Sequence, residues 1–280
     1  MQQFTDRQHM LSPDFEFFHY QDDPCMEVRY HNHNFYEIYF LLSGNVTYLI
    51  EGNAYKLKPG DILLINDTEL HKPLIEPGRS YERIVIWINP VFLHEQSCPE
   101  MDLTAGFKSA DCKKVLRLEA ENLSYLRHLM GKLEKASIYG GYGDNILRKI
   151  HLTEILVHLH KALLQNRDAS TSYEIVFNER IRAMIQYING NLGADLSLER
   201  LSALFYLSKY HLLREFKKNA GYTLHQYILE KRLIMAKSFL KEGANVTEAC
   251  LRCGFKNYSN FIRAFKKKFG VPPGKYLKAN

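Results

Sequence analysis

Two histidines and a glutamate near the start of the chain form its best candidate for a metal or ligand site. They follow the pattern His31-x-His33-x3-Glu37. Residues two apart on a strand point to the same face of a sheet, and imidazoles combined with a carboxylate can bind a divalent metal. The same groups can instead line a pocket for a polar ligand or have only a structural role. We expect the pocket lining, with no bound metal and no other cofactor.

Turn residues divide the surrounding segment, from about residue 28 to 90, into short strands. The β-rich runs end at Ser43-Gly44-Asn45, at Glu51-Gly52-Asn53 and at Pro59-Gly60-Asp61. Short strands with turns about every 8–12 residues predict an antiparallel sandwich or small barrel, which can hold one small ligand. If odd-numbered residues face its interior, the walls combine aromatic and polar side chains. Such walls suit a sugar or another small polar metabolite. The expected ligand-binding residues are His31, His33, Glu37, Tyr39, Arg83 and Trp87.

These segments resemble the two sequence motifs of the cupin family. His31-x-His33-x3-Glu37-x6-Gly44 resembles the first motif, and Pro59-Gly60-Asp61 resembles the start of the second. The resemblance implies a cupin-like β-barrel, and cupin-like sensor domains keep the first motif without a metal, as hydrogen-bonding structure at the barrel entrance. His71 does not lie at the spacing that the second motif uses for its histidine. That departure argues against a metal site.

Beyond residue 115 the hydrophobic period changes from 2 to about 3.5, which predicts helices. A second amphipathic helix is expected from about residue 145 to 165, and the polar segment 166–172 is the expected linker. We predict that residues 115–165 form a homodimer through a heptad seam; the alternative is that both helices only cover the barrel. The seam consists of Leu116, Leu123 and Met130 with Leu126 and Leu133.

The two halves of the chain carry opposite net charge. Residues 178–280 contain 19 Lys and Arg against 7 Asp and Glu, whereas residues 1–177 contain 18 against 24. The C-terminal part therefore has a net charge of +12 and the N-terminal part −6. A strongly basic half favours a polyanionic partner such as nucleic acid for that half alone.

The basic half contains two similar pairs of helices. Ser197 and Ser208 are the predicted N-caps of the first pair, and Asn245 and Asn257 are those of the second. Between the pairs, Thr223 opens a long helix with a T-x-x-Q capping box. A short helix, a tight turn and a basic second helix are typical of helix-turn-helix units.

The last hundred residues or so resemble the DNA-binding domain of AraC/XylS-type transcription regulators. Residues 196–221 are similar to its first half and residues 249–276 to its second. A cupin-like barrel, two helices and this domain are the common layout of the family, which implies a one-chain regulator controlled by a ligand in the barrel. The specific motif of the second half is Gly254-Phe255…Phe261…Arg263-x-Phe265-Lys266…Gly270-x-x-Pro273.

Residues near the N-terminus of each recognition helix can reach base edges in the major groove. The helix at 224–240 would be about 25 Å long and can hold two recognition helices in groove segments about 34 Å apart. Leu213 cannot hydrogen-bond a base and can instead contact a thymine methyl, while base and phosphate contacts remain alternatives for Arg214 and Arg263. The expected DNA-binding residues are Tyr210, His211, Leu213, Arg214 and Lys217 in the first unit and Tyr258, Ser259, Asn260, Arg263 and Lys267 in the second.

The sequence thus predicts a multidomain α and β protein. We expect an N-terminal antiparallel, cupin-like β-barrel at residues 1–110, a helical dimerisation region with the linker at 111–172, and an all-α domain with two helix-turn-helix motifs at 173–280. The expected function is that of a sequence-specific DNA-binding transcription regulator controlled by a small polar ligand. The alternatives are a metal-dependent cupin enzyme with a DNA-targeting domain and a regulator without a small-molecule effector.

Other classes of protein are disfavoured by composition. No run approaches the ~18 apolar residues of a membrane span, the N-terminus has no signal-peptide pattern, and five cysteines at irregular spacing do not form a disulfide framework. Cys250-x-x-Cys253 lies where small apolar residues must pack, so we expect a structural role. The chain is expected to be a cytoplasmic non-enzyme whose partners are double-stranded promoter DNA, a small-molecule effector, a second copy of itself and RNA polymerase, without a membrane.

Overall fold

The computed structural model describes residues 7–22, 28, 30–78, 80–108, 114–165 and 178–278. The chain divides into two compact units, one comprising Met1–Ile50 and Ala54–Val176 and the other Glu51–Asn53 and Phe177–Asn280. The predicted linker at 166–172 lies outside the described residues.

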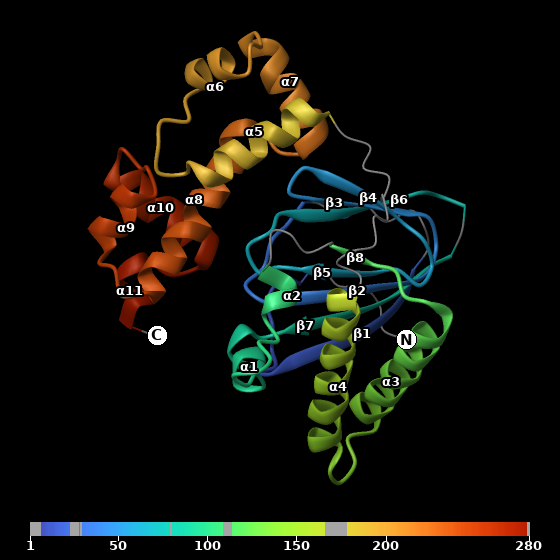
Figure 1. The fold of residues 1–280 in the computed structure, drawn as a ribbon. Helices are drawn as coiled ribbons and strands as arrows, with labels where there is room; N and C mark the ends of the chain where they lie inside the picture. Colours follow the sequence, from blue (N-terminus) through green and yellow to red (C-terminus); the bar gives the residue numbers. More distant parts are fainter. Residues whose placement is uncertain are drawn as a thin grey trace. The chain divides into compact units, whose positions relative to one another are not determined.

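The first unit is built on two β-sheets (Figure 1). The five-stranded sheet has the order β1-β7-β2-β5-β8, with antiparallel pairing throughout, and the three-stranded sheet has the order β4-β3-β6. Gly44 and Gly60 take φ values of 114° and 100° in turns between strands, a conformation that glycine adopts without steric cost. The predicted fold class is confirmed. The strands are β1 (Phe15–Asp22), β2 (Tyr36–Ser43), β3 (Val46–Ile50), β4 (Asn53–Leu57), β5 (Ile62–Ile65), β6 (His71–Ile75), β7 (Tyr81–Ile88) and β8 (Val115–Leu116).

The five-stranded sheet separates two hydrophobic cores. On one face, Tyr39 and Leu41 of β2 belong to an aromatic-rich core shared with the three-stranded sheet. On the other face, Ile38 and Phe40 pack in a core shared with the helices. Helices α3 and α4 lie side by side under this face (Figure 1). The helices of this unit are α1 (Pro90–Glu95), α2 (Ala105–Lys108), α3 (Ala120–Tyr139) and α4 (Asp144–Gln165).

The predicted heptad seam is buried inside the first unit. Leu116 lies in strand β8, before α3 begins. Leu126, Met130 and Leu133 are at most 1% exposed and belong to the core beneath the five-stranded sheet, and Leu123 packs against the same core. The seam is therefore wrong as a dimer interface, because an apolar stripe in a sequence does not reveal which surface covers it.

The second unit is entirely helical among its elements from residue 178 to 278. The side chains of Ser197, Ser208, Asn245 and Asn257 each accept a hydrogen bond from a backbone N–H, and the capping box at Thr223 is formed. The final helix begins at Pro273, because proline is well tolerated in a first turn. The helices are α5 (Glu179–Gly190), α6 (Leu198–Leu204), α7 (Lys209–Ala220), α8 (Leu224–Lys241), α9 (Val246–Arg252), α10 (Tyr258–Phe269) and α11 (Pro273–Lys278).

The two cysteines of the C-x-x-C sequence are core residues of the second helix-turn-helix unit. Cys250 and Cys253 are buried in one cluster with Phe261 and Phe265. Burial, together with the adjacent Cys250 thiol, raises the pKa of Cys253 to about 12, so this thiol stays protonated and chemically inert at neutral pH. Among helices in the part of the chain that the structure describes, none is long and apolar enough to cross a bilayer.

Candidate ligand pocket and nucleic-acid interface

A cavity of about 60 Å³ lies within the first unit, and five of the six predicted ligand-binding residues line it. Strands β2 and β7 pair so that Glu37 lies opposite Trp87 and Tyr39 lies opposite Val85. Alternate residues of both strands therefore face the same interior. His33 does not line the cavity, and the five that do are His31, Glu37, Tyr39, Arg83 and Trp87.

Glu37 is a buried carboxylate with three polar partners. Its oxygens accept hydrogen bonds from the Trp87 indole N–H at 3.1 Å and the Tyr48 hydroxyl at 3.3 Å, and His33 Nε2 lies 3.2 Å from Oε2. Burial by itself raises the pKa of Glu37, but the hydrogen bond to His33 and the charge of the His33 and His31 imidazoles lower it to about 2. The Glu37 carboxylate is therefore ionised at neutral pH and can accept hydrogen bonds from a ligand.

Arg83 and three tyrosines form a second polar part of the pocket. The Arg83 guanidinium donates to Asp22 at 2.5 Å and lies 4.8 Å and 4.1 Å from the ring centroids of Tyr20 and Tyr81. The hydroxyls of Tyr39 and Tyr81 are 3.0 Å apart. Burial raises the pKa of Tyr20 and of Tyr81 to about 12. These phenols therefore stay protonated and can donate as well as accept hydrogen bonds.

His71 lies beside His31 and His33, although it is not at the spacing that the second cupin motif uses for its histidine. One ring nitrogen from each of the three imidazoles lies within 4.8 Å of the others. Burial and the other two imidazoles lower the pKa of His71 well below its usual range, so its ring is neutral. Three imidazoles with a neutral member form a set of ligands that a divalent metal can use.

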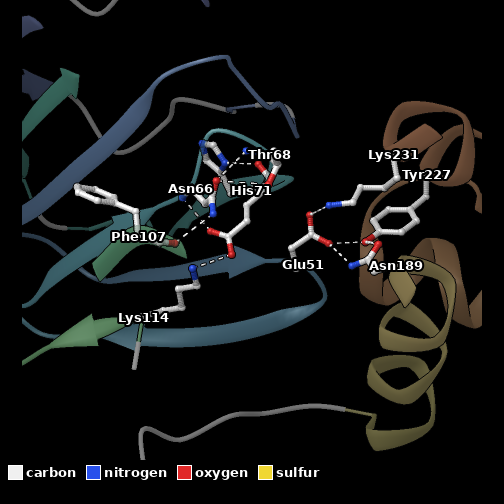
Figure 2. Close-up of polar contacts among 10 residues, drawn as sticks. Glu51, Asn66, Thr68, His71, Phe107, Lys114, Asn189, Tyr227 and Lys231 are labelled. Carbon is white, nitrogen blue, oxygen red and sulfur yellow. Dashed lines mark hydrogen bonds and ion pairs between the residues drawn. The ribbon is translucent and has the colours of Figure 1, made fainter. Parts of the chain in front are cut away.

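The connection between β5 and β6 fixes the position of His71 (Figure 2). His71 Nδ1 donates to the carbonyl of Glu69 at 2.9 Å. The Glu69 carboxylate in turn accepts from the N–H of Asn66 at 2.9 Å and pairs with Lys114 at 2.7 Å. The Asn66 side chain donates to the carbonyl of Phe107 at 3.2 Å. With Nδ1 engaged, Nε2 is the nitrogen of His71 that is available to a ligand.

Eight residues that line the cavity were absent from the predicted set, among them Tyr81, Tyr20, Tyr48 and Arg7. Tyr81 satisfies the same odd-numbered rule as its neighbours and could have been found from it. Tyr20 and Tyr48 are even-numbered on strands whose register the sequence does not reveal. Arg7 precedes the first strand, and its guanidinium lies 5.1 Å from the ring centroid of Trp87; the sequence contains no feature that indicates this contact.

All ten predicted DNA-binding residues lie on α7 or α10. Nine are exposed and His211 is half-buried. Equivalent positions of the two helices are 49 residues apart, so the N-caps Ser208 and Asn257 correspond, as do Arg214 and Arg263. Each arginine donates to the side chain three residues earlier: Arg214 to His211 Nδ1 at 3.4 Å and Arg263 to Asn260 Oδ1 at 2.5 Å.

The two recognition helices contribute to one groove of the second unit. Its volume is about 800 Å³. Leu213 of α7 lines it together with Asn260, Arg263 and Lys267 of α10, and residues of α8 line it as well. Predicted DNA-binding residues from both helix-turn-helix units therefore face a common space, and its polar lining includes the cations needed to bind phosphate.

The comparisons with known proteins agree with this division. The family model "AraC-like ligand binding domain" matches residues 16–98 and the model "Helix-turn-helix domain" matches residues 201–279. The multiple antibiotic resistance protein MarA of Escherichia coli is 38% identical over 101 residues, which cover 36% of this chain and 80% of MarA. YbfI of Bacillus subtilis, an uncharacterised HTH-type transcriptional regulator, is 25% identical over 232 residues, covering 82% of this chain and 80% of YbfI.

Among solved structures, a probable AraC family transcriptional regulator from Rhodopseudomonas palustris matches with 30% identity and a TM-score of 0.34, covering 36% of this chain and 97% of that one. The family models and the curated relatives define a DNA-binding transcription regulator with a ligand-binding domain before its helix-turn-helix domain. The chain belongs to the AraC/XylS family.

Proposed function

We propose that this protein binds two adjacent major-groove segments of promoter DNA through α7 and α10, and that a small polar ligand in the barrel pocket controls this binding. The groove shared by Leu213 of α7 and Asn260 and Arg263 of α10 carries the proposal. Two helices that face one space can contact one face of the duplex, where major-groove segments recur about every 34 Å. Lys217 and Lys267, further along each helix, are the proposed phosphate contacts.

Selection of binding sites from random DNA by the full-length protein tests the DNA part of this proposal. We expect a bipartite site whose halves are one helical turn apart. Recovery of random sequences at low salt would indicate non-specific binding only, and no binding at all would overturn the proposal. We further propose that RNA polymerase is a partner at such promoters, that the protein acts in the cytoplasm and that it has no catalytic activity of its own, as its relatives are transcription regulators.

The chemistry of the pocket supports a small polar ligand. Glu37 accepts hydrogen bonds, the phenols of Tyr39 and Tyr81 donate and accept them, and Trp87 offers an apolar wall. Such a combination orients a ligand rich in hydroxyl groups. A thermal-shift screen of monosaccharides and small hydroxy acids can identify this ligand. A ligand at 100 times its Kd raises the free energy of unfolding by about 2.7 kcal/mol.

A matched pair of variants tests the location of the ligand. Tyr39→Phe removes a hydroxyl from the pocket face of β2, and Tyr36→Phe removes one from the opposite face of the same strand. We expect only Tyr39→Phe to reduce the thermal shift given by the best compound of the screen. Equal effects of both variants would place the ligand elsewhere, and the absence of any shift across the screen would favour a regulator without a small-molecule effector.

Self-association remains part of the proposal, through a different surface from the heptad seam. Ile146 and Ile150, one turn apart near the start of α4, are 66% and 53% exposed, and Leu147 beside them is 43% exposed. Exposed apolar residues grouped on one helix are typical of protein interfaces. We expect Ile146→Glu combined with Ile150→Glu to give monomers by light scattering, whereas Lys161→Glu on the same helix leaves the mass of the wild type; equal masses for all three proteins would exclude this surface.

The three imidazoles support a second candidate, a divalent metal in the barrel. His31, His33 and His71 would hold the ion, and Glu37 beside His33 could complete the set. The ion would serve as the effector or, in the alternative enzyme hypothesis, as a Lewis acid. Metal analysis of purified protein distinguishes the candidates: about one divalent ion per chain, lost in His33→Ala, supports the metal, and a metal-free protein that binds a sugar supports the first candidate.

A further inference from the structure

The two recognition helices differ in the chemistry of the side chains they expose. Tyr210 and Leu213 of α7 are 76% and 40% exposed. Their equivalents 49 residues later on α10 are Ser259, a small hydroxyl, and Ile262, which packs against the core of its own unit. The first helix therefore presents an apolar surface at positions where the second presents a polar group or none.

We infer that α7 recognises thymine methyl groups through Leu213 and Tyr210, whereas α10 recognises guanine through Arg263 and Asn260, an inference that rests on the proposed DNA-binding function. The thymine C5 methyl is the one apolar group on the major-groove edges of the four bases. Leu213 offers no donor or acceptor, so a methyl group is the base feature that it can contact favourably. Leu213 lines the groove to which Asn260 and Arg263 of α10 also contribute, which is why we assign it a contact with DNA.

Tyr210 extends the apolar surface of α7. The Arg214 guanidinium lies 5.9 Å from the centroid of its ring, and Arg214 is also hydrogen-bonded to His211. The ring and the arginine thus lie on adjacent positions of one helix face. An arginine that contacts guanine next to an apolar surface that contacts thymine predicts a first half-site containing both bases.

The polar pair on α10 exposes donors only. Arginine has no acceptor, so the Asn260 atom that faces Arg263 is the carbonyl oxygen Oδ1. That contact uses the Asn260 acceptor, so the amide hydrogens of Asn260 and the remaining guanidinium hydrogens of Arg263 are the groups that can donate to a base. Guanine is the base that presents two acceptors, N7 and O6, in the major groove. The contacts made by Arg263 and Asn260 are therefore expected to depend on guanine and to be indifferent to thymine methyls.

Replacement of thymine by deoxyuridine tests this inference, because it removes the C5 methyl and keeps base pairing. The site is first selected with the full-length protein, and Arg214→Ala and Arg263→Ala assign its halves to α7 and α10. We then expect deoxyuridine in the α7 half-site to weaken binding about fourfold for each contacted methyl, the loss equivalent to one buried CH₂ group. The same replacement in the α10 half-site should change the affinity by less than about 1.5-fold, well below that one-methyl loss.

One variant on each recognition helix makes the test specific. Leu213→Ala should reduce the difference between thymine and deoxyuridine in the α7 half-site, and Ser259→Ala on α10 should leave that difference unchanged. Equal losses in the two half-sites, or no loss in either, would overturn the inference while the selected site still supported the proposed function. If the wild-type protein selects no site, the proposed function and the inference both fail.

Discussion

The polar side chains of the barrel pocket are buried, whereas those of the recognition helices are exposed. Glu37 lies in the interior with its oxygens hydrogen-bonded or paired to Trp87, Tyr48 and His33. Arg263 lies on an exposed helix surface, where it donates to the Asn260 side chain three residues earlier. A buried polar group is costly unless it is paired, so the pocket residues contribute to stability as well as to binding. The exposed residues of α7 and α10 can change with little effect on the fold.

The largest expected effect on stability comes from a substitution in the core beneath the barrel. Met130→Glu places a charge at a fully buried position of α3, which should reduce the free energy of unfolding by more than about 4 kcal/mol. Lys132→Glu, on the exposed side of the same helix, should change it by less than about 0.5 kcal/mol. Chemical denaturation measures both. A folded Met130→Glu monomer would instead restore the heptad seam as a dimer interface.

Loss of the buried carboxylate is the next largest effect. Glu37→Gln should cost roughly 2–4 kcal/mol, because Trp87, Tyr48 and His33 lose an ionised partner. Glu121→Gln, on the exposed surface of α3, serves as the control.

The pH dependence of stability follows from the same carboxylate. Its pKa is about 2 in the folded protein against an ordinary value of 4.5. A depressed folded-state pKa adds stability that is fully present above the unfolded value and is lost as pH falls through the folded value. We therefore expect wild type to lose this contribution between about pH 4.5 and 2 and Glu37→Gln to lack that part of the slope; parallel pH profiles would contradict the assignment.

A smaller effect, on DNA binding alone, is expected at the exposed surface. Arg263→Ala should weaken binding to the selected site by about 1–3 kcal/mol and relax preference at one base pair. Lys267→Ala should weaken selected and random DNA alike and lower the salt dependence by about one unit of slope. Titrations at several salt concentrations separate the two. A change in unfolding free energy above about 0.5 kcal/mol in either variant would mean that the surface is not independent of the fold.

The smallest effect concerns the turn before α7. Tyr206 has φ of 53° and is 93% exposed, while Gly254 takes φ of 75° in the corresponding turn of the second unit. A left-handed backbone is unfavourable for a residue with a Cβ atom. Tyr206→Gly should therefore stabilise the protein by about 0.5–1 kcal/mol after the greater freedom of glycine in the unfolded chain is counted. Tyr206→Ala keeps the strain, so an equal gain in both variants would contradict this explanation.

Features determined by neighbouring residues were predictable from the sequence. The N-caps at Ser208 and Asn257 and the capping box at Thr223 depend on side chains within three residues of the backbone groups they bind. The alternation of β2 and β7 likewise identified Glu37 and Trp87 as residues of one interior.

Features that depend on distant parts of the chain were not predictable from the sequence. His71 joins His31 through a bridge between segments that are 40 residues apart, and spacing within one motif does not reveal such a pairing. The sequence correctly predicted that Leu126 and Leu133 belong to an apolar stripe of one helix. Only the structure shows that this stripe packs in the core of the first unit. Arg7 reaches the pocket from outside any regular element.

Strand β2 separates the ligand pocket from the helical layer by the thickness of one backbone. Glu37 and Tyr39 point into the pocket, while Ile38 and Phe40, their immediate neighbours, pack in the core that includes α3 and α4. A ligand that displaces β2 from the pocket side therefore also displaces the side chains of β2 against which α3 and α4 pack. A shift of one peptide unit of β2 moves side chains on both faces of the sheet. Allosteric coupling between an effector and the helices of this unit therefore requires no extended chain of residues.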